Sequence, residues 1–307
     1  MEPEARDIVT VVGPTAVGKS RAAVDLALRF GGEVLSGDSV QVYRGFDIGT
    51  DKPTPASMRG VPHHLIDIAG PEVQFTAADF VREALAAAAA IASRGRLPIV
   101  AGGTGLYLRA LVDGLFPGPG RDPAVRARLE AEAREQGLEA LFRRLEAVDP
   151  DYAAKVRSRD RVRIIRALEV HALTGQPLSA HFLRTESPVR GRNVLRLGLR
   201  LERTVLVRRI EERVERMFER GLVEEVRGLL ARGVPETAAP FRALGYRHVV
   251  AHVRGRMSLD EAVTLTKTDT RQYAKRQMTW FRKMAGVAWF SPDDRAGLEQ
   301  YVQNHLQ

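Results

Sequence analysis

The sequence predicts an α/β fold in which a parallel β-sheet is interrupted by an all-helical insertion. Short apolar runs at residues 7–12, 33–36 and 97–101 predict buried strands, and segments with helical spacing lie between them. From about residue 122 to 175, by contrast, the chain has helical patterns and no convincing strand. Alternating strands and helices are typical of a parallel sheet with helices on both faces, so we assign the first part of the chain to such a core.

Each further core element has its own local pattern. Residues 21–30 carry apolar side chains at helical spacing, and the alanine-rich stretch 77–92 also predicts a helix. In residues 194–201 leucine stands at every second position from 195, which predicts a strand that returns to the sheet. The remaining stretch, from 204 to 283, is predicted to be mostly helical.

Proline and glycine clusters delimit the insertion. Residues 117–120 read Pro-Gly-Pro-Gly, and breakers recur between 187 and 191. Asp122 and Pro123 predict a helix start, with the proline at the first helical position. We therefore expect a core domain made of residues 1–116 and 194–307, and a helical insertion domain made of residues 117–193.

The composition excludes several classes of protein. No apolar run approaches the roughly 20 residues of a membrane helix, and the acidic N-terminus lacks a signal core. Cysteine is absent, which excludes disulfides and thiolate metal sites, so we expect a cytoplasmic location. The net charge of +9 favours a polyanionic partner, with a general arginine bias and an evenly basic surface as the alternative.

A phosphate-binding loop follows the first predicted strand. The motif G-x-x-x-x-G-K-[ST] is met in full and opens the first helix, as in a P-loop NTPase-like core. Backbone N–H groups would face the phosphate oxygens, Lys19 would add a charge, and the Ser20 hydroxyl can bind Mg²⁺. By itself the loop suggests ATP as the ligand. The predicted di- or triphosphate site consists of Gly13, Pro14, Thr15, Ala16, Val17, Gly18, Lys19 and Ser20.

The acidic residue of an ordinary ATPase is missing from its usual place. A Walker B strand ends in an aspartate that holds Mg²⁺, whereas the strand at 97–101 runs into Gly-Gly-Thr-Gly. Asp38 instead follows the second strand, at the edge where parallel sheets bind ligands. Its position suits a magnesium ligand, a general base or a helix cap, and all three roles stay open.

Several motifs, in a fixed order, span nearly the whole chain. They lie at residues 13–20, 36–50, 52–53, 62–67, 102–107, 166–170, 245–246, 272–277 and 279–282. Together they resemble one family, the tRNA dimethylallyltransferases (tRNA isopentenyltransferases). Gly37 and Asp51 stand where that family usually has alanine, and we expect neither to touch a residue assigned to the chemistry. The zinc finger of eukaryotic members is absent, which fits the lack of cysteine.

The resemblance implies a reaction. Members of the family transfer a dimethylallyl group from dimethylallyl diphosphate to N6 of the adenine next to the anticodon of tRNA, at position 37. It implies that Asp38 takes the N6 proton, and that the P-loop, Lys19 and Mg²⁺ on Ser20 stabilise the departing diphosphate. Arg213 matches a family arginine near the diphosphate. The alternative is a surface arginine paired with neighbouring glutamates.

The resemblance also implies an RNA-binding surface. An adenine in an anticodon loop must leave its stack to reach the site. The breakers at 117–120 and 188–191, rather than the resemblance, suggest that the insertion moves as a unit to admit the tRNA. Taken singly, each arginine of the insertion is more often a solvated charge than an RNA contact. The implied tRNA-binding residues are Asp38, Ser39, Val40, Gln41, Thr104, Arg126, Arg163, Arg166, Arg276 and Lys283.

The C-terminal block predicts an amphipathic helix. If residues 271–283 form one helix, one face carries Gln272, Arg276, Thr279 and Lys283, and another carries Tyr273, Gln277, Trp280 and Met284. A basic face beside an aromatic one suits RNA phosphates against a packed core. The alternative is an ordinary amphipathic helix whose aromatic face is core.

The adjacent His63 and His64 invite comparison with a metal site. They lack a third ligand at a useful spacing, so a structural turn is favoured.

Three functions are compatible with these patterns. The first is a Mg²⁺-dependent prenyltransferase that uses dimethylallyl diphosphate and the anticodon stem-loop of tRNA. The second is a P-loop small-molecule kinase of the nucleotide-kinase type, and the third is a non-catalytic RNA-binding protein. The basic C-terminal helix and the large insertion favour the first, and we expect a monomer.

Overall fold

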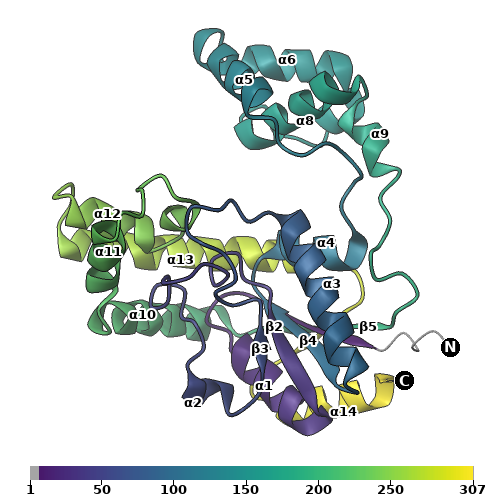
Figure 1. Ribbon diagram of the computed structural model, residues 1–307, viewed down its shortest axis with the longest axis vertical. Helices are drawn as coiled ribbons and strands as arrows, with labels where there is room; N and C mark the ends of the chain where they lie inside the picture. The colour runs from purple at the N-terminus through teal and green to yellow at the C-terminus, as the bar shows by residue number, and fades with distance from the viewer. Residues whose placement is uncertain (1–6, 307) are drawn as a thin grey trace. The chain divides into compact units, whose positions relative to one another are not determined.

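One parallel β-sheet forms the centre of the larger part of the chain (Figure 1). The computed structural model describes residues 7–306. Within them the strands lie in the order β3-β2-β4-β1-β5-β6, and every neighbouring pair is parallel. The carboxyl ends of β2, β4 and β1 therefore meet at one edge of the sheet. The strands are β1 Ile8–Val12, β2 Gly32–Ser36, β3 His63–His64, β4 Leu97–Gly102, β5 Val194–Leu199 and β6 Val287–Phe290.

The helices of this unit come before and after the insertion. They are α1 Lys19–Phe30, α2 Pro55–Met58, α3 Ala77–Ser93, α4 Gly105–Asp113, α10 Arg203–Glu219, α11 Leu222–Ala231, α12 Tyr246–Val253, α13 Leu259–Phe281 and α14 Arg295–His305, with a 3₁₀ turn at Ala239–Arg242. None of the helices in the described part of the chain is both long and apolar enough to cross a membrane.

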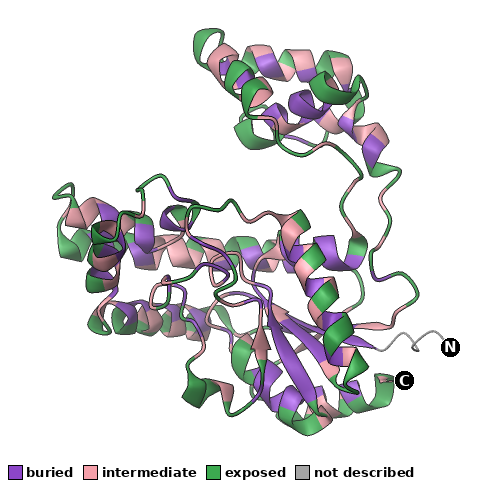
Figure 2. Cartoon of the chain, viewed as in Figure 1, coloured by how far each residue is buried: buried purple, intermediate pink, exposed green. Residues whose placement is uncertain are grey.

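Helices cover both faces of the sheet, which confirms the predicted fold class. Val9 and Val11 of β1 face a core shared with α1, α10 and α14. Ile8 and Val12 point the other way, into a core shared with α3 and α4. Successive side chains of a strand point to opposite faces, so burial of both sets requires cover on both sides. Figure 2 shows the buried central strands.

The predicted strands and the face of β5 are confirmed, whereas the two edge strands were missed. The leucines at 195, 197 and 199 all point into one core, as their spacing predicts. The predicted turn at His63 and His64 is wrong, because these residues form β3 and pair with Val34 and Leu35 of β2. At the other edge, β6 pairs with β5. Strands of two and four residues are too short to show an alternating pattern.

A third hydrophobic core fixes the loop that follows β2. Phe46 of this loop is fully buried and packs edge-on against Phe241 and Tyr246. Side chains of α11 and α12 complete this core. The loop that begins after β2 is thereby attached to the C-terminal helices.

The insertion is a separate helical unit with its own core. It spans Asp113–Pro188, so its limits lie at 113 and 188 rather than at the expected 117 and 193. The later limit moves because Val189 packs in the core of the larger unit and the Asn193 carbonyl accepts a hydrogen bond from Ile8. The Asp122 side chain caps α5, with Pro123 at the start, as predicted. The helices are α5 Pro123–Glu135, α6 Leu138–Val148, α7 Pro150–Ala153, α8 Arg161–Thr174 and α9 Leu178–Phe182.

Candidate active site

The P-loop joins β1 to α1 in a turn that needs glycine. Gly13 has φ +150°, and a Cβ there would lie 2.7 Å from the Leu199 carbonyl oxygen of β5. Gly18, in the left-handed region at φ 105°, stands at the N-cap of α1, which begins at Lys19. The backbone N–H groups at a helix start attract anions. The local geometry therefore suits the predicted phosphate ligand.

Lys19 lies half-buried at the first position of α1. Its Nζ donates a hydrogen bond to the Pro14 carbonyl at 2.8 Å. Burial lowers the pKa of Lys19 to about 7, with a further lowering from the charge of Arg213 and an opposing effect of Asp38. Lys19 and Arg213 thus lie close enough to repel each other, and the nearby Asp38 does not fully offset this effect on Lys19. A bound diphosphate would supply that charge and keep Lys19 protonated.

Arg213 reaches the P-loop from α10. Its Nη1 donates to Thr15 Oγ1 at 2.6 Å, and its Nη2 lies 3.4 Å from the Thr50 carbonyl, to which it also donates. The expected alternative, pairing with glutamate neighbours, does not occur: Glu211 pairs with Arg271, and Glu212 with Arg208 and Arg216. Arg213 is therefore placed where a cation can meet the ligand of the loop.

Asp51 contacts this arginine, contrary to expectation. Asp51 Oδ2 lies 3.2 Å from Arg213 Nε, and Oδ1 lies 3.4 Å from Arg220 Nη1. The Arg213 Nε is buried, yet the geometry of this ion pair gives it no hydrogen bond. Asp51 thus touches a residue assigned to the chemistry, because the loop after β2 turns back over the P-loop.

Asp38 stands two residues after the end of β2, at the carboxyl edge of the sheet. Its Oδ1 accepts hydrogen bonds from the backbone N–H of Val40 at 2.8 Å and of Gln41 at 3.4 Å. These bonds close a turn, and no helix follows, so the helix-cap alternative is wrong. Both bonds use Oδ1, and neither engages Oδ2. The half-buried carboxylate is compatible with the role of a base.

The loop after β4 lies against the loop after β2. Thr104 Oγ1 accepts a hydrogen bond from the Ser39 N–H at 3.0 Å and donates one to Ser39 Oγ at 3.3 Å. The Thr104 N–H also donates to the Gly37 carbonyl at 3.4 Å. Gly37 thus contacts a predicted tRNA-binding residue, whereas the expectation concerned the residues assigned to the chemistry. The structure thus brings Asp38, Ser39 and Thr104 together.

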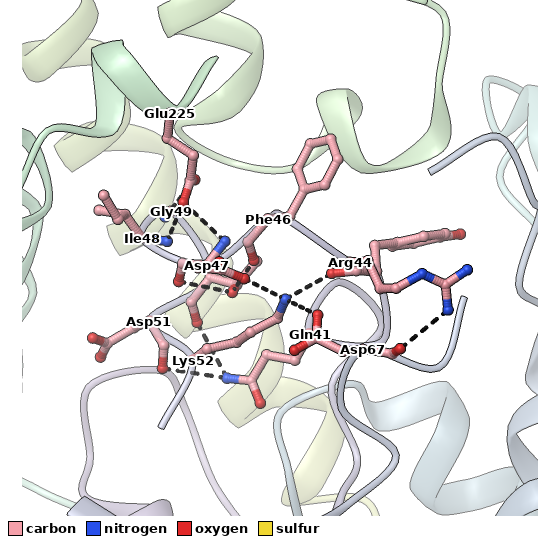
Figure 3. Close-up of polar contacts among 12 residues, drawn as sticks. Gln41, Arg44, Phe46, Asp47, Ile48, Gly49, Asp51, Lys52, Asp67 and Glu225 are labelled. Atoms are coloured by element: carbon pink, nitrogen blue, oxygen red, sulfur yellow. Dashed lines mark hydrogen bonds and ion pairs between the residues drawn. The ribbon is translucent and has the colours of Figure 1, made fainter. Parts of the chain in front are cut away.

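A buried lysine holds the shape of the loop that carries Asp38 (Figure 3). Lys52 Nζ donates to the Tyr43 carbonyl at 2.7 Å and forms ion pairs of 2.5 Å with Asp47 Oδ1 and Asp67 Oδ1. The Gln41 amide donates to the Thr50 carbonyl at 3.2 Å and, through its oxygen, accepts from Ser36 at 2.9 Å. Gln41 therefore has a structural role in addition to its predicted contact with the adenine of the tRNA.

A glutamate from α11 fastens the far end of the same loop. Glu225 Oε2 accepts the backbone N–H of Asp47 at 3.0 Å and of Ile48 at 2.7 Å, as Figure 3 shows. The Tyr246 hydroxyl donates to Glu225 Oε1 at 2.5 Å. Burial and the adjacent Glu225 carboxylate raise the pKa of Tyr246 well above its usual range. Neither Lys52 nor Glu225 was assigned a role from the sequence. The backbone partners of Glu225 lie about 177 positions away, and the partners of Lys52, at 43, 47 and 67, lie in loops without a regular spacing.

The C-terminal helix α13 ends at Phe281, earlier than predicted. Lys283 is exposed and lies beyond the helix, so the predicted face that it shares with Arg276 is wrong. Arg276 is exposed, with its guanidinium 5.9 Å from the centre of the Tyr273 ring. Gln277, which we assigned to a packed face, is buried and bonded to the P-loop. A polar residue on an otherwise aromatic face was the available signal, because a buried amide needs partners.

The arginines of the insertion belong to the separate helical unit. Arg126 Nη2 and Arg166 Nη1 lie 3.1 Å and 2.8 Å from Oε2 of Glu169, whose side chain is fully buried. Arg163 pairs with Asp160 at 3.5 Å and is about half exposed. Two of the three predicted RNA contacts therefore already stabilise the fold of the insertion.

A magnesium ion would find few ligands in the protein itself. Within residues 7–306, no group of three or more histidine, aspartate or glutamate side chains is placed to hold a metal ion. Ser20 is exposed in the first turn of α1. Mg²⁺ commonly keeps several waters and binds through one or two protein ligands plus substrate phosphates. The residues present fit an ion held jointly by Ser20 and a bound diphosphate.

Comparison with known proteins gives one consistent family. The model of the family described as IPP transferase matches residues 41–284. A tRNA dimethylallyltransferase of Geobacter metallireducens is 54% identical over 288 residues, which cover 94% of this chain and 93% of that protein. One of Thermomicrobium roseum is 50% identical over 297 residues, covering 96% and 89%.

Solved structures agree with these relatives. The tRNA isopentenylpyrophosphate transferase of Bacillus halodurans has a TM-score of 0.73 at 41% identity, covering 98% of this chain and 96% of that one. A eukaryotic dimethylallyltransferase, seen acting on tRNA, has a TM-score of 0.80 at 28% identity, covering 97% and 76%. These matches confirm the resemblance inferred from the motifs, and the chain belongs to the IPP transferase family.

Proposed function

We propose that this chain is an enzyme that transfers a dimethylallyl group from dimethylallyl diphosphate to N6 of the adenine 3′ to the tRNA anticodon, at position 37, and releases diphosphate. The observation that carries the proposal is the P-loop after β1 and the Asp38 carboxylate after β2, which lie at the same carboxyl edge of the sheet on either side of β4. Lys19 belongs to the P-loop, Arg213 contacts it through Thr15, and Asp38 is close enough to affect the pKa of Lys19. The relatives at 54% and 50% identity bear the name of this activity.

The Asp38 carboxylate would activate the N6 amine, which is the nucleophile. The N6 amine of adenine is a poor nucleophile because its lone pair is delocalised into the ring. A carboxylate that accepts a hydrogen bond from N6 orients the amine and takes its proton as the new C–N bond forms. Asp38 is the residue for this role, since Oδ1 is fixed by the turn and the whole group stands at the ligand-binding edge.

The P-loop would stabilise the departing diphosphate. Negative charge grows on the bridging oxygen and on the phosphates as the carbon–oxygen bond breaks. Backbone N–H groups at the start of α1, Lys19 and Arg213 stabilise that charge. Mg²⁺ on Ser20 would add further neutralisation of the diphosphate. Thr15, a residue of the loop, accepts the hydrogen bond that holds Arg213 in place.

The RNA side of the site is proposed from the loops around Asp38. Ser39, Val40, Gln41 and Thr104 would line the extruded adenine, and Arg276 on α13 would meet the phosphate backbone. The exposed Lys283 and the arginines of the insertion, Arg126, Arg163 and Arg166, complete the proposed set. A cytoplasmic location and a monomeric state stay predictions.

The test is transfer of a labelled prenyl group. Purified protein, Mg²⁺, labelled dimethylallyl diphosphate and an unmodified tRNA with adenine at position 37 should give labelled tRNA and free diphosphate. A tRNA with guanine at that position is the matched control and should stay unlabelled. Phosphate transfer from ATP to a small molecule, without labelling of tRNA, would instead support the kinase alternative.

A further inference from the structure

Gln277 of α13 connects the C-terminal helix to the phosphate-binding loop. Its side chain is 6% exposed. Its Oε1 accepts a hydrogen bond from the Thr15 N–H at 2.8 Å, and its Nε2 donates to the Gly103 carbonyl at 2.8 Å. We propose that Gln277 is a positioning residue that holds Thr15, and with it the P-loop, in the conformation that binds the diphosphate. This inference deepens the proposed function and rests on it.

The two bonds require an amide at this place. One end of the side chain must accept from Thr15 and donate to Gly103, and among neutral side chains of this length glutamine does both. A carboxylate could accept from Thr15 but could not donate to Gly103. A methionine of similar size could do neither, and would leave the half-buried Thr15 N–H and the buried Gly103 carbonyl without these partners.

Thr15 is held from two helices at once. Gln277 of α13 binds its backbone N–H, while Arg213 of α10 donates to its hydroxyl at 2.6 Å. Ala16, the next residue, has φ 64°, a left-handed conformation that is unusual for alanine and needs support from its surroundings. The bond from Gln277 supplies such support directly before the unusual residue.

The glycine loop after β4 is shaped around the same amide. A Cβ on Gly103 would lie 2.3 Å from Gln277 Nε2 and 3.6 Å from Lys19 Nζ. Nε2 is the end of a long side chain. The Gln277 side chain is nevertheless buried and both of its polar atoms are hydrogen-bonded, so it cannot move aside freely. Gly103, Gln277 and Lys19 therefore converge on one point, and the glycine makes room for the contact.

The same helix also reaches the base side of the site. Tyr273 stands one turn before Gln277, and burial raises its pKa to about 12, together with the nearby charge of Asp38. Hydrogen bonds to the side chains of Thr104 and Gln277 oppose that rise. Through Gln277 and Tyr273, α13 thus contacts both the P-loop and the loop that carries Thr104.

The experiment compares Gln277→Met with Gln303→Met, which makes the same change at an exposed glutamine of α14. Binding of inorganic diphosphate with Mg²⁺ and the KM for dimethylallyl diphosphate are measured beside the Kd for tRNA. We expect Gln277→Met to weaken diphosphate binding and raise that KM about tenfold, because two backbone groups lose their partners. The Kd of Gln277→Met for tRNA should stay unchanged, as should all three constants of Gln303→Met.

Two results would overturn the inference. One is a folded Gln277→Met protein that binds diphosphate like the wild type. The other is an equal loss of tRNA binding, which would mean that the residue merely supports α13. If Gln277→Met does not fold, the isosteric Gln277→Glu takes its place, and it too must weaken diphosphate binding without weakening tRNA binding. Because diphosphate binding needs no prenyl transfer, failure of the labelled transfer with wild-type protein would count against the proposed function alone.

Discussion

The charged groups around Thr15 would rearrange when a diphosphate binds. Arg213 donates to Thr15, while Asp51 lies 3.2 Å from the same guanidinium and also pairs with Arg220. A carboxylate in this position repels an incoming anion and competes for Arg213. Since Thr15 and Thr50 also hold Arg213, loss of Asp51 should not displace the arginine.

Asp51→Ala is therefore expected to bind diphosphate more tightly. The pair is partly exposed, so we expect product inhibition by diphosphate to strengthen by about two- to fivefold. The measurement is the inhibition constant of inorganic diphosphate in the transfer assay. Asp293→Ala is the control, because Asp293 lies 4.0 Å from Arg209 and is more exposed. Weaker inhibition in Asp51→Ala would show that Asp51 positions Arg213 rather than competing for it.

Lys19 predicts proton uptake when the diphosphate binds. Its pKa in the folded protein is about 7, below the ordinary 10.5, so near pH 8 most of the free protein has a neutral Lys19. A bound diphosphate favours the charged form of Lys19, so the wild-type protein should take up close to one proton at this residue when diphosphate binds. The Lys19→Arg protein should take up no such proton, because arginine is already charged. Calorimetry in two buffers of different ionisation enthalpy counts these protons. Equal counts in both proteins would contradict the prediction.

The same shift has a consequence for stability. Between about pH 7 and pH 10 the unfolded chain binds a proton at Lys19 that the folded chain has lost. This residue therefore makes the ligand-free protein more stable as pH rises through that range, and it contributes no pH dependence below it.

Residues with a local signal were predictable, and those with distant partners were not. The P-loop and Asp38 follow predicted strands directly, and their roles depend on where a strand ends. Gln277 bonds to Thr15, 262 positions away, and Glu225 bonds to Ile48, 177 positions away. No spacing within a single helix reveals such partners. Once the chain is folded, their burial and their polar contacts identify them.

The secondary-structure elements divide in the same way. β1, β2, β4 and β5 were predicted because each carries a run of buried side chains of its own. β3 and β6 form at the sheet edges through pairing with β2 and β5, and their half-buried residues give no pattern. α13 ends at Phe281 and a turn leads from it into β6, whereas the composition alone extended the helix to residue 283.

The close approach of the loops after β2 and β4 gives a prediction for Gly102. A Cβ on this residue would lie 2.2 Å from the Gly37 carbonyl oxygen, which is backbone and cannot turn aside. We expect Gly102→Ala to lower the free energy of unfolding by about 2 kcal/mol or more, as overpacking does. Gly120→Ala, with no atom near the added group, should change it by less than about 0.5 kcal/mol. Denaturant unfolding compares the two, and equal stability would contradict the packing argument.

The whole molecule consists of two units with different tasks. The larger unit, residues 7–112 and 189–306 of the described chain, contains the P-loop, Asp38, Arg213 and Gln277. The smaller unit has a core of its own, and its Arg126 and Arg166 form ion pairs with the buried Glu169. Hydrogen bonds from these arginines hold the pKa of Glu169 below its usual range, despite its burial. The sequence predicted the helical character of this unit and approximate limits, because its breakers and helix caps are local.

The proposed chemistry depends on one carboxylate beside one anion site, and a single measurement tests both together. Single-turnover transfer from labelled dimethylallyl diphosphate to tRNA is followed with wild-type protein and with Asp38→Asn. We expect Asp38→Asn to transfer at least about a hundredfold more slowly, since it lacks a base, while its Kd for diphosphate and for tRNA stays within about threefold. Transfer by Asp38→Asn at the wild-type rate would contradict the role of Asp38 and the mechanism built on it.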